Sequence, residues 1–196
     1  MQTFADLATD LKVDDHGIQK WTVARRPDGN VRPEDFAWRE SEIPELQPNQ
    51  VLLKTHYLSL APVLRGYMSG QSFAGETALD IGDVIHGRGV GQVVRSRHPD
   101  WHEGQVVQGQ IGWQTYKVSA MTPAEKFRAM PLNGLSASLG LGALGMTGLS
   151  AWAGYFNVGE PKSGETVLVS GAVGGVGSLV IQFASQISGG DVVGIA

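Results

Sequence analysis

The chain has 196 residues, of which 42% are hydrophobic and 17% are charged, and its formal net charge is −4. This composition is typical of a globular protein with a packed core, and it argues against wholesale disorder and against nucleic acid or an anionic membrane as the main partner. The absence of cysteine excludes disulfides, thiolate nucleophiles and cysteine-ligated zinc sites.

Residues 1–17 carry neither the basic segment nor the apolar segment of a signal peptide. The sequence also contains no apolar run of membrane-spanning length. We therefore expect a cytoplasmic protein in which residues 1–20 form a mobile or loosely attached leader.

Residues 21–125 show a β pattern. The segment 51–58 (VLLKTHYL) is a plausible strand with partial alternation, and the short segments 90–96 (VGQVVRS) and 104–109 (GQVVQG) are Val-rich, as is typical of strands. Turn signals separate such segments, at 26–29, 47–49 and 98–100. Many short strands at this spacing predict a small antiparallel barrel or sandwich.

The pattern becomes helical from about Pro131. The segments 133–140 and 147–154 both contain G-L-S-A-x-x-G, which predicts two helix starts with small residues for close packing. Ser136 and Ser150 do not complete the G-x-S-x-G pattern, so a nucleophile elbow is disfavoured.

Residues 165–196 predict a β-α-β unit. ETVLVS at 165–170 is expected to be a buried strand, and DVVGIA at 191–196 is expected to begin a second strand. Between them, one apolar face recurs at helical spacing, formed by Val176, Leu179, Val180, Phe183, Ala184 and Ile187.

A glycine-rich turn joins the first of these strands to the helix. It carries the G-x-G-x-x-G pattern with alanine in the first position, at Ala172, Val173, Gly174, Gly175, Val176 and Gly177. Small residues there let a pyrophosphate approach the helix N-terminus, and Gly177 lets the helix pack close to the strand. A tight turn that binds nothing is the alternative. The residue that would distinguish NAD from NADP follows the second strand, beyond Ala196, so the choice stays open.

Four stretches together resemble the zinc-independent double-bond reductases of the medium-chain dehydrogenase/reductase family, which include curcumin, prostaglandin and alkenal reductases. The stretches are 56–68, 80–119, 141–152 and 161–178. The resemblance implies an α/β protein with a GroES-like β barrel at 21–125, the start of a Rossmann fold at 126–196, and an active site between them. Family members are longer, so we expect a truncated form or a fragment, with a homodimer in the full-length form.

The resemblance implies NADP(H) as the cofactor and an enone or enal as the small-molecule substrate, reduced by hydride transfer. Tyr57 matches a family tyrosine of the substrate site, where a hydroxyl would stabilise the enolate oxygen; a strand tyrosine packed in the core is the alternative. Arg65 is a candidate substrate ligand or a structural partner of a carboxylate. Met146, Thr147 and Gly148 resemble the family loop beside the nicotinamide, or else form only a helix-start turn.

The sequence departs from the family where Asp-Pro-Tyr-Met-Arg is expected, because it has Ala-Pro-Val-Leu-Arg at 61–65. The family's substrate preference is therefore not carried over. His98 and His102 have the spacing of a helical metal pair, but Pro99 lies between them, so we expect a surface turn and no metal. A quinone reductase of the same superfamily is the alternative enzyme, and an inactive fragment or β-domain interaction module is the alternative of another class.

Overall fold

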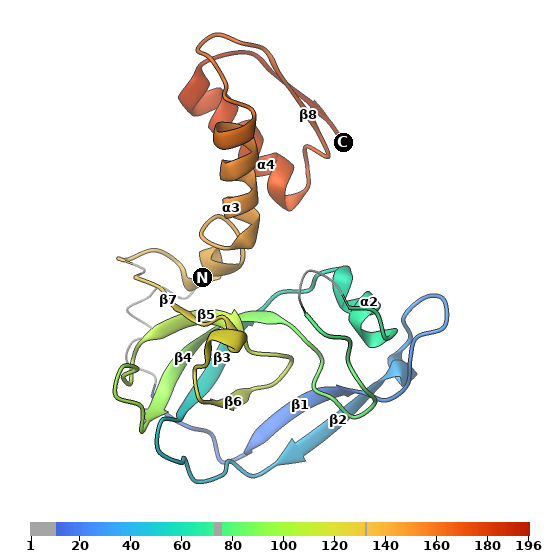
Figure 1. Ribbon diagram of the computed structural model, residues 1–196, viewed down its shortest axis with the longest axis vertical. Helices are drawn as coiled ribbons and strands as arrows, with labels where there is room; N and C mark the ends of the chain where they lie inside the picture. Colours follow the sequence, from blue (N-terminus) through green and yellow to red (C-terminus); the bar gives the residue numbers. More distant parts are fainter. Residues whose placement is uncertain (1–10, 73–75, 132) are drawn as a thin grey trace. The chain divides into compact units, whose positions relative to one another are not determined.

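The structure is a computed structural model that describes residues 11–72, 76–131 and 133–196 (Figure 1). It consists of two compact units, Met1–Ser138 and Leu139–Ala196. The boundary lies beyond the predicted one at residue 125, because the short strand β7 (Arg128–Ala129) pairs with a strand of the first unit. None of the helices in these described ranges is long and apolar enough to cross a membrane.

The first unit consists mainly of antiparallel strands, as predicted. One sheet has the order β6-β3-β4-β5-β7, and a separate ribbon pairs β1 with β2. The strands other than β7 are β1 (Ile18–Val23), β2 (Phe36–Ser41), β3 (Val51–Leu58), β4 (Arg88–Ser96), β5 (Val106–Gln110) and β6 (Tyr116–Ser119). The helical segments of this unit are η1 (Pro33–Asp35), α2 (Val63–Met68) and η2 (Pro123–Glu125). Isolated bridges from Lys20 to Gln114 and from Thr22 to Val84 join the ribbon to the rest.

The predicted strands lie close to the observed ones. The segment at 51–58 coincides with β3. β4 begins at Arg88, earlier than predicted, because Arg88 pairs with Gln110 of β5. β5 begins at Val106 rather than at Gly104, because Gly104 has a positive φ of 87° and belongs to the preceding turn.

Part of the predicted leader is ordered against the first unit. Residues 1–10 lie outside the described residues, whereas Ile18 to Lys20 belong to β1. The backbone N–H of Asp14 donates to the Tyr116 hydroxyl at 2.9 Å, and that hydroxyl donates to the Asp14 carboxylate at 3.0 Å. Lys54 Nζ also donates to the carbonyl of Lys12 at 3.1 Å, and Val13 packs against the cluster around Ile18, so the described part of the predicted leader is attached to the first unit from Lys12 onward.

Both faces of β3 are covered at its start. Val51, Leu52 and Leu53 are fully buried in succession. Leu52 packs with a cluster around Ile18, while Val51 and Leu53 pack with Val93 on the other face. This double coverage explains why the strand begins with an apolar run instead of alternating.

The second unit contains the predicted β-α-β unit. β8 (Val167–Ser170) and β9 (Val192–Ile195) pair in parallel, and α4 (Gly175–Phe183) connects them. α4 continues into the π-helical segment η5 (Ala184–Ser188). Before β8 lie the 3₁₀ segment η3 (Ala137–Leu141), which spans the unit boundary, then α3 (Met146–Trp152) and its π-helical continuation η4 (Ala153–Val158).

Two details of this unit differ from prediction. The strand at 165–170 is buried on one face only, since Val169 is buried but Leu168 is 65% exposed, because α4 covers only one face of the two-stranded sheet. On the predicted apolar face of the helix, Ala184 is fully buried but Ile187 is 64% exposed. Ile187 lies in η5, where the wider π-helical turn rotates it away from that face.

The two G-L-S-A segments also begin differently from each other. The first leads into the 3₁₀ segment η3, whereas the second lies inside α3. Gly140, Gly142 and Gly145 separate the two, and glycine disfavours a continuous helix there. Only the second segment therefore forms an α-helix.

Candidate functional site

The start of α4 presents exposed backbone amides. Gly174 is the N-cap residue, with extended dihedrals (φ −75°, ψ 168°) and no capping side chain. The first N–H groups of a helix have no acceptor within the helix, so those of residues 175–177 are left for other partners. Gly174 and Gly175 are exposed, and Val173 is 82% exposed. The turn therefore offers an uncapped, accessible helix N-terminus of the kind that binds anions.

The small residues of this turn are required by close backbone packing. A Cβ atom at Gly177 would overlap the carbonyl oxygen of Gly171 and would lie 3.0 Å from the Cα of Ala172. Alanine is accommodated in place of the first glycine because Gly194 of β9 lies beside it. A Cβ at Gly194 would lie only 2.8 Å from the Cβ of Ala172. The predicted packing role of Gly177 thus has a direct structural basis.

Met146, Thr147 and Gly148 lie at the start of α3, next to this turn. The Thr147 methyl lies 2.9 Å from the position that a Cβ of Gly175 would occupy. Gly148 is buried, and a Cβ there would overlap the carbonyl of Ala143. Figure 1 shows α3 and α4 side by side, so two predicted groups of cofactor ligands converge within the second unit.

Tyr57 and Arg65 both lie in the first unit. Tyr57 follows an irregularity in β3, is half-buried, and has no hydrogen-bond partner for its hydroxyl among the described residues. The Arg65 side chain is exposed, and its Nε donates to the carbonyl of Gly29 at 2.9 Å. Arg65 therefore holds a turn through a backbone carbonyl rather than a carboxylate, and its role toward a substrate stays a prediction.

His98 and His102 lie in a turn, as predicted. Nδ1 of His98 accepts from the backbone N–H of Asp100 at 3.1 Å, and the backbone N–H of His102 donates to Gln105 at 2.7 Å. Within residues 11–72, 76–131 and 133–196, no group of three or more histidine, aspartate or glutamate side chains could hold a metal ion. The absence of a metal from the protein stays a prediction for metal analysis.

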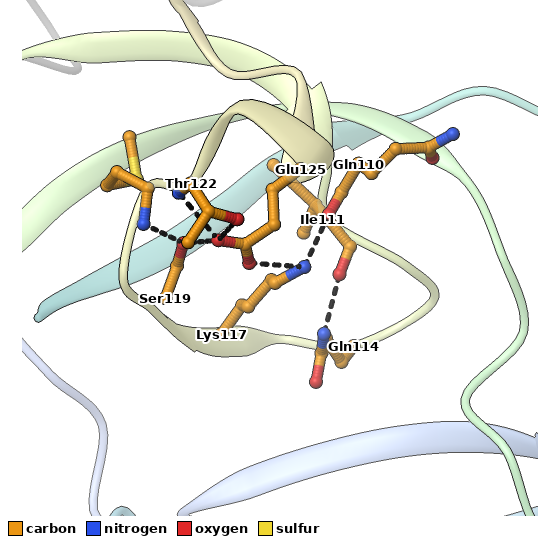
Figure 2. Close-up of polar contacts among 8 residues, drawn as sticks. Gln110, Ile111, Gln114, Lys117, Ser119, Thr122 and Glu125 are labelled. Atoms are coloured by element: carbon orange, nitrogen blue, oxygen red, sulfur yellow. Dashed lines mark hydrogen bonds and ion pairs between the residues drawn. The ribbon is translucent and has the colours of Figure 1, made fainter.

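A polar cluster around Glu125 was not anticipated (Figure 2). Its carboxylate pairs with Lys117 at 3.2 Å and accepts from the Ser119 hydroxyl at 2.9 Å and from the Thr122 backbone N–H at 3.1 Å. Burial raises the pKa of Glu125, but the charge of Lys117 and these hydrogen bonds outweigh burial and hold the pKa below its ordinary value. The T-x-x-E spacing at 122–125 is a capping-box signal that could have revealed this cluster.

A cavity of about 240 Å³ lies beside this cluster. Glu125, Lys117, Gln110 and Glu76 are among the residues that line it. Glu76 is paired with Lys126 and accepts from the Gln110 amide at 3.0 Å. The acids and lysines at its rim are paired with each other, so the cavity wall carries no uncompensated charge from them.

Replacing Glu125 with glutamine is expected to destabilise the first unit at pH 7. The substitution removes the ion pair with Lys117 and weakens the hydrogen bonds that the carboxylate accepts from Ser119 and Thr122. The folded pKa is lowered, so this stabilisation is full above the unfolded glutamate pKa of about 4.3 and is lost as pH falls through the folded value. Melting temperatures at pH 7 and in mild acid measure both effects. Glu103→Gln, at an exposed acid, is the control; equal melting temperatures for the two variants at pH 7 would contradict the expectation.

Comparison with known proteins identifies the family. Residues 19–127 match the family described as the N-terminal domain of oxidoreductase. The chain belongs to this family. Curcumin and prostaglandin reductases, which the sequence resemblance named, are among its relatives.

The similar proteins are about twice as long as the chain. It is 41% identical over 178 residues to the NADPH-dependent curcumin reductase of Escherichia coli (strain K12), a match that covers 91% of the chain and 50% of that protein. It is 35% identical to prostaglandin reductase 1 of Oryctolagus cuniculus, over 91% of the chain and 48% of the relative. The crystal structure of CurA in complex with NADPH from Vibrio vulnificus aligns with a TM-score of 0.76 at 35% identity, over 91% of the chain and 51% of that structure.

Proposed function

We propose that the protein is an NADPH-dependent oxidoreductase that reduces the carbon–carbon double bond of α,β-unsaturated ketones or aldehydes. The uncapped, glycine-lined N-terminus of α4 is the observation that carries the proposal. The names of the curcumin and prostaglandin reductases and the NADPH complex of CurA support the cofactor and the reaction type. A cytoplasmic location and a homodimer of the full-length form belong to the same proposal.

The residues of the second unit fit a dinucleotide. Amides of residues 175–177 would hold the pyrophosphate, because Gly174 and Gly175 leave no side chain in its way. Thr147 lies against the same turn and would contact the nicotinamide half together with Met146 and Gly148. When bound, NADPH supplies the hydride.

The residues of the first unit would act on the substrate carbonyl. Negative charge develops on that oxygen as the double bond is reduced, and a hydroxyl donor aimed at it stabilises the charge. The hydroxyl of Tyr57 is available for this role, because it is not engaged with any described residue. Arg65 would support the neighbouring loop through Gly29 and, in the same proposal, contact the substrate.

Steady-state NADPH oxidation with an enone and with a quinone tests this function. Enone reduction by the purified protein supports it, whereas activity with the quinone alone would favour the quinone reductase alternative. Tyr57→Phe is expected to lower kcat/KM for the enone by on the order of 100-fold, the usual effect of losing one oxyanion donor, with unchanged NADPH affinity. Tyr116→Phe is the control, because the hydroxyl of Tyr116 is bound to Asp14 and serves stability. Unchanged turnover of Tyr57→Phe would remove the catalytic role.

A further inference from the structure

Arg88, the first residue of β4, is the one arginine of the chain that is not exposed. All nine arginines lie in the described ranges, and the other eight have exposed side chains. Several of those eight still hold partners: Arg26 donates to the carbonyl of Leu79 at 3.1 Å, and Arg97 donates to that of Leu46 at 2.7 Å. The guanidinium of Arg88 has no hydrogen bond or ion pair with any described residue. Arg88 is therefore a half-buried arginine whose guanidinium is not engaged by the described residues.

The position of Arg88 in the sheet places it beside Tyr57. Val90 lies opposite Tyr57 on β3, and Arg88 lies opposite Gln110 on β5. Alternate residues of a strand and directly opposed residues share one face, so Tyr57, Arg88 and Gln110 belong to the same face. Tyr57 and Arg88 are diagonal neighbours, whose Cα atoms in such a pair are about 7–8 Å apart, within reach of an arginine side chain.

The groups around Arg88 do not neutralise it. Glu76, the acid nearest to Gln110 in the hydrogen-bond network, is already paired with Lys126. The side-chain oxygen of Gln110 is buried without a partner, and it is in any case uncharged. None of the nitrogens of Arg88 is among the buried atoms that lack a partner, so its guanidinium is accessible to solvent and to a ligand.

We infer that Arg88 binds a carboxylate of the substrate. The planar guanidinium matches a carboxylate with two parallel hydrogen bonds, which makes this anion its best partner. A substrate whose carboxylate is bound by Arg88 would have its carbonyl within reach of the Tyr57 hydroxyl, which lies on the same face of the sheet. The preferred substrates are therefore enones or enals that carry a carboxylate. This substrate class rests on the proposed function; the carboxylate site itself does not.

Ligand binding without cofactor tests the inference. The probes are benzalacetone and its para-carboxylate derivative, which differ only in the anionic group. Titration is followed through the arginine side-chain N–H signals in ¹⁵N-correlated NMR spectra, and the Arg88 signal is assigned from its loss in Arg88→Gln. The carboxylate probe is expected to shift that signal and to bind at least about tenfold more weakly to Arg88→Gln, as for the loss of a hydrogen bond to a charged group. Neutral benzalacetone is expected to be unaffected by the substitution.

Two control variants separate this site from a general charge effect. Arg95→Gln removes an exposed arginine from the same strand and is expected to leave the affinity of the carboxylate probe unchanged. Arg88→Lys keeps the charge without the planar fork and is expected to bind with intermediate affinity. Unchanged affinity in Arg88→Gln, an equal loss in Arg95→Gln, or no binding of the carboxylate probe to the parent would each overturn the inference. Because no turnover is measured, a failure of the reductase assay would leave this result standing.

Discussion

Replacing Gly174 with aspartate is expected to weaken NADPH binding by on the order of 100-fold. Gly174 is the N-cap of α4, and aspartate is among the best N-cap residues because its carboxylate accepts from the next amides of the helix. The new carboxylate would occupy the amides that the pyrophosphate needs, and it would repel the phosphates. The helix itself should not lose stability, so the lost affinity would not arise from unfolding.

Isothermal calorimetry at fixed salt measures this effect. Gly174→Ala is the matched control, because its methyl group would lie 3.2 Å from the carbonyl of Gly171 and adds no charge. Ser185→Asp adds the same charge at the far end of the helix, in η5. Equal NADPH affinity in Gly174→Asp and in Gly174→Ala would show that the phosphates do not bind at this turn.

Valine in place of Gly177 is expected to destabilise the β-α-β unit by about 3 kcal/mol, at the upper end of the usual cost of overpacking. The added Cβ would meet the backbone of Gly171 and Ala172, which cannot move aside easily. Gly171 has a positive φ of 61°, and the N–H of Ala172 is bonded to the carbonyl of Ile195 in β9. Relieving the overlap would therefore disturb the strand pairing as well as the turn.

Hydrogen exchange resolved along the chain tests this expectation. Amides of β8, α4 and β9 should lose protection in Gly177→Val, while those of β3 and β4 should keep it, because they belong to the other unit. Gly171→Ala is the control, since a Cβ there meets nothing within 4 Å and costs only the positive φ, about 1 kcal/mol. Equal protection of β8 in the two variants would contradict the packing role of Gly177.

Local sequence patterns were sufficient to predict many of the strands and the β-α-β unit. Partial alternation marked β3, and the Val-rich segments marked β4 and β5 to within a few residues, because β-branched side chains favour a pleated, buried surface. The glycine turn was identifiable because a strand precedes it and a helix follows it, and both are set by short-range periodicity. The parallel pairing of β8 with β9 followed from the predicted strand-helix-strand order, because a β-α-β unit joins parallel strands.

What the sequence did not predict depends on which segments become neighbours. The exposure of Leu168 follows from how many strands and helices cover the sheet, and no local signal records that. The partners of Glu125 come from the end of β6 and from the turn itself, so its lowered pKa required the observed geometry. No sequence pattern distinguished Arg88 from the other eight arginines. Only the pairing of its strand with β3 and β5 places it beside Tyr57 and Gln110.

The strand order of the first unit has a consequence during synthesis. β3 pairs with β4 on one side and with β6 on the other, and β6 begins only at Tyr116. At about 5–20 residues per second, the ribosome needs several seconds after completing β3 to deliver β6. During that interval one edge of an apolar strand has no partner in the nascent chain, and it is open to chaperones and to neighbouring chains. β8 and β9 form a far more local pair, so the β-α-β unit spends much less time in this vulnerable state.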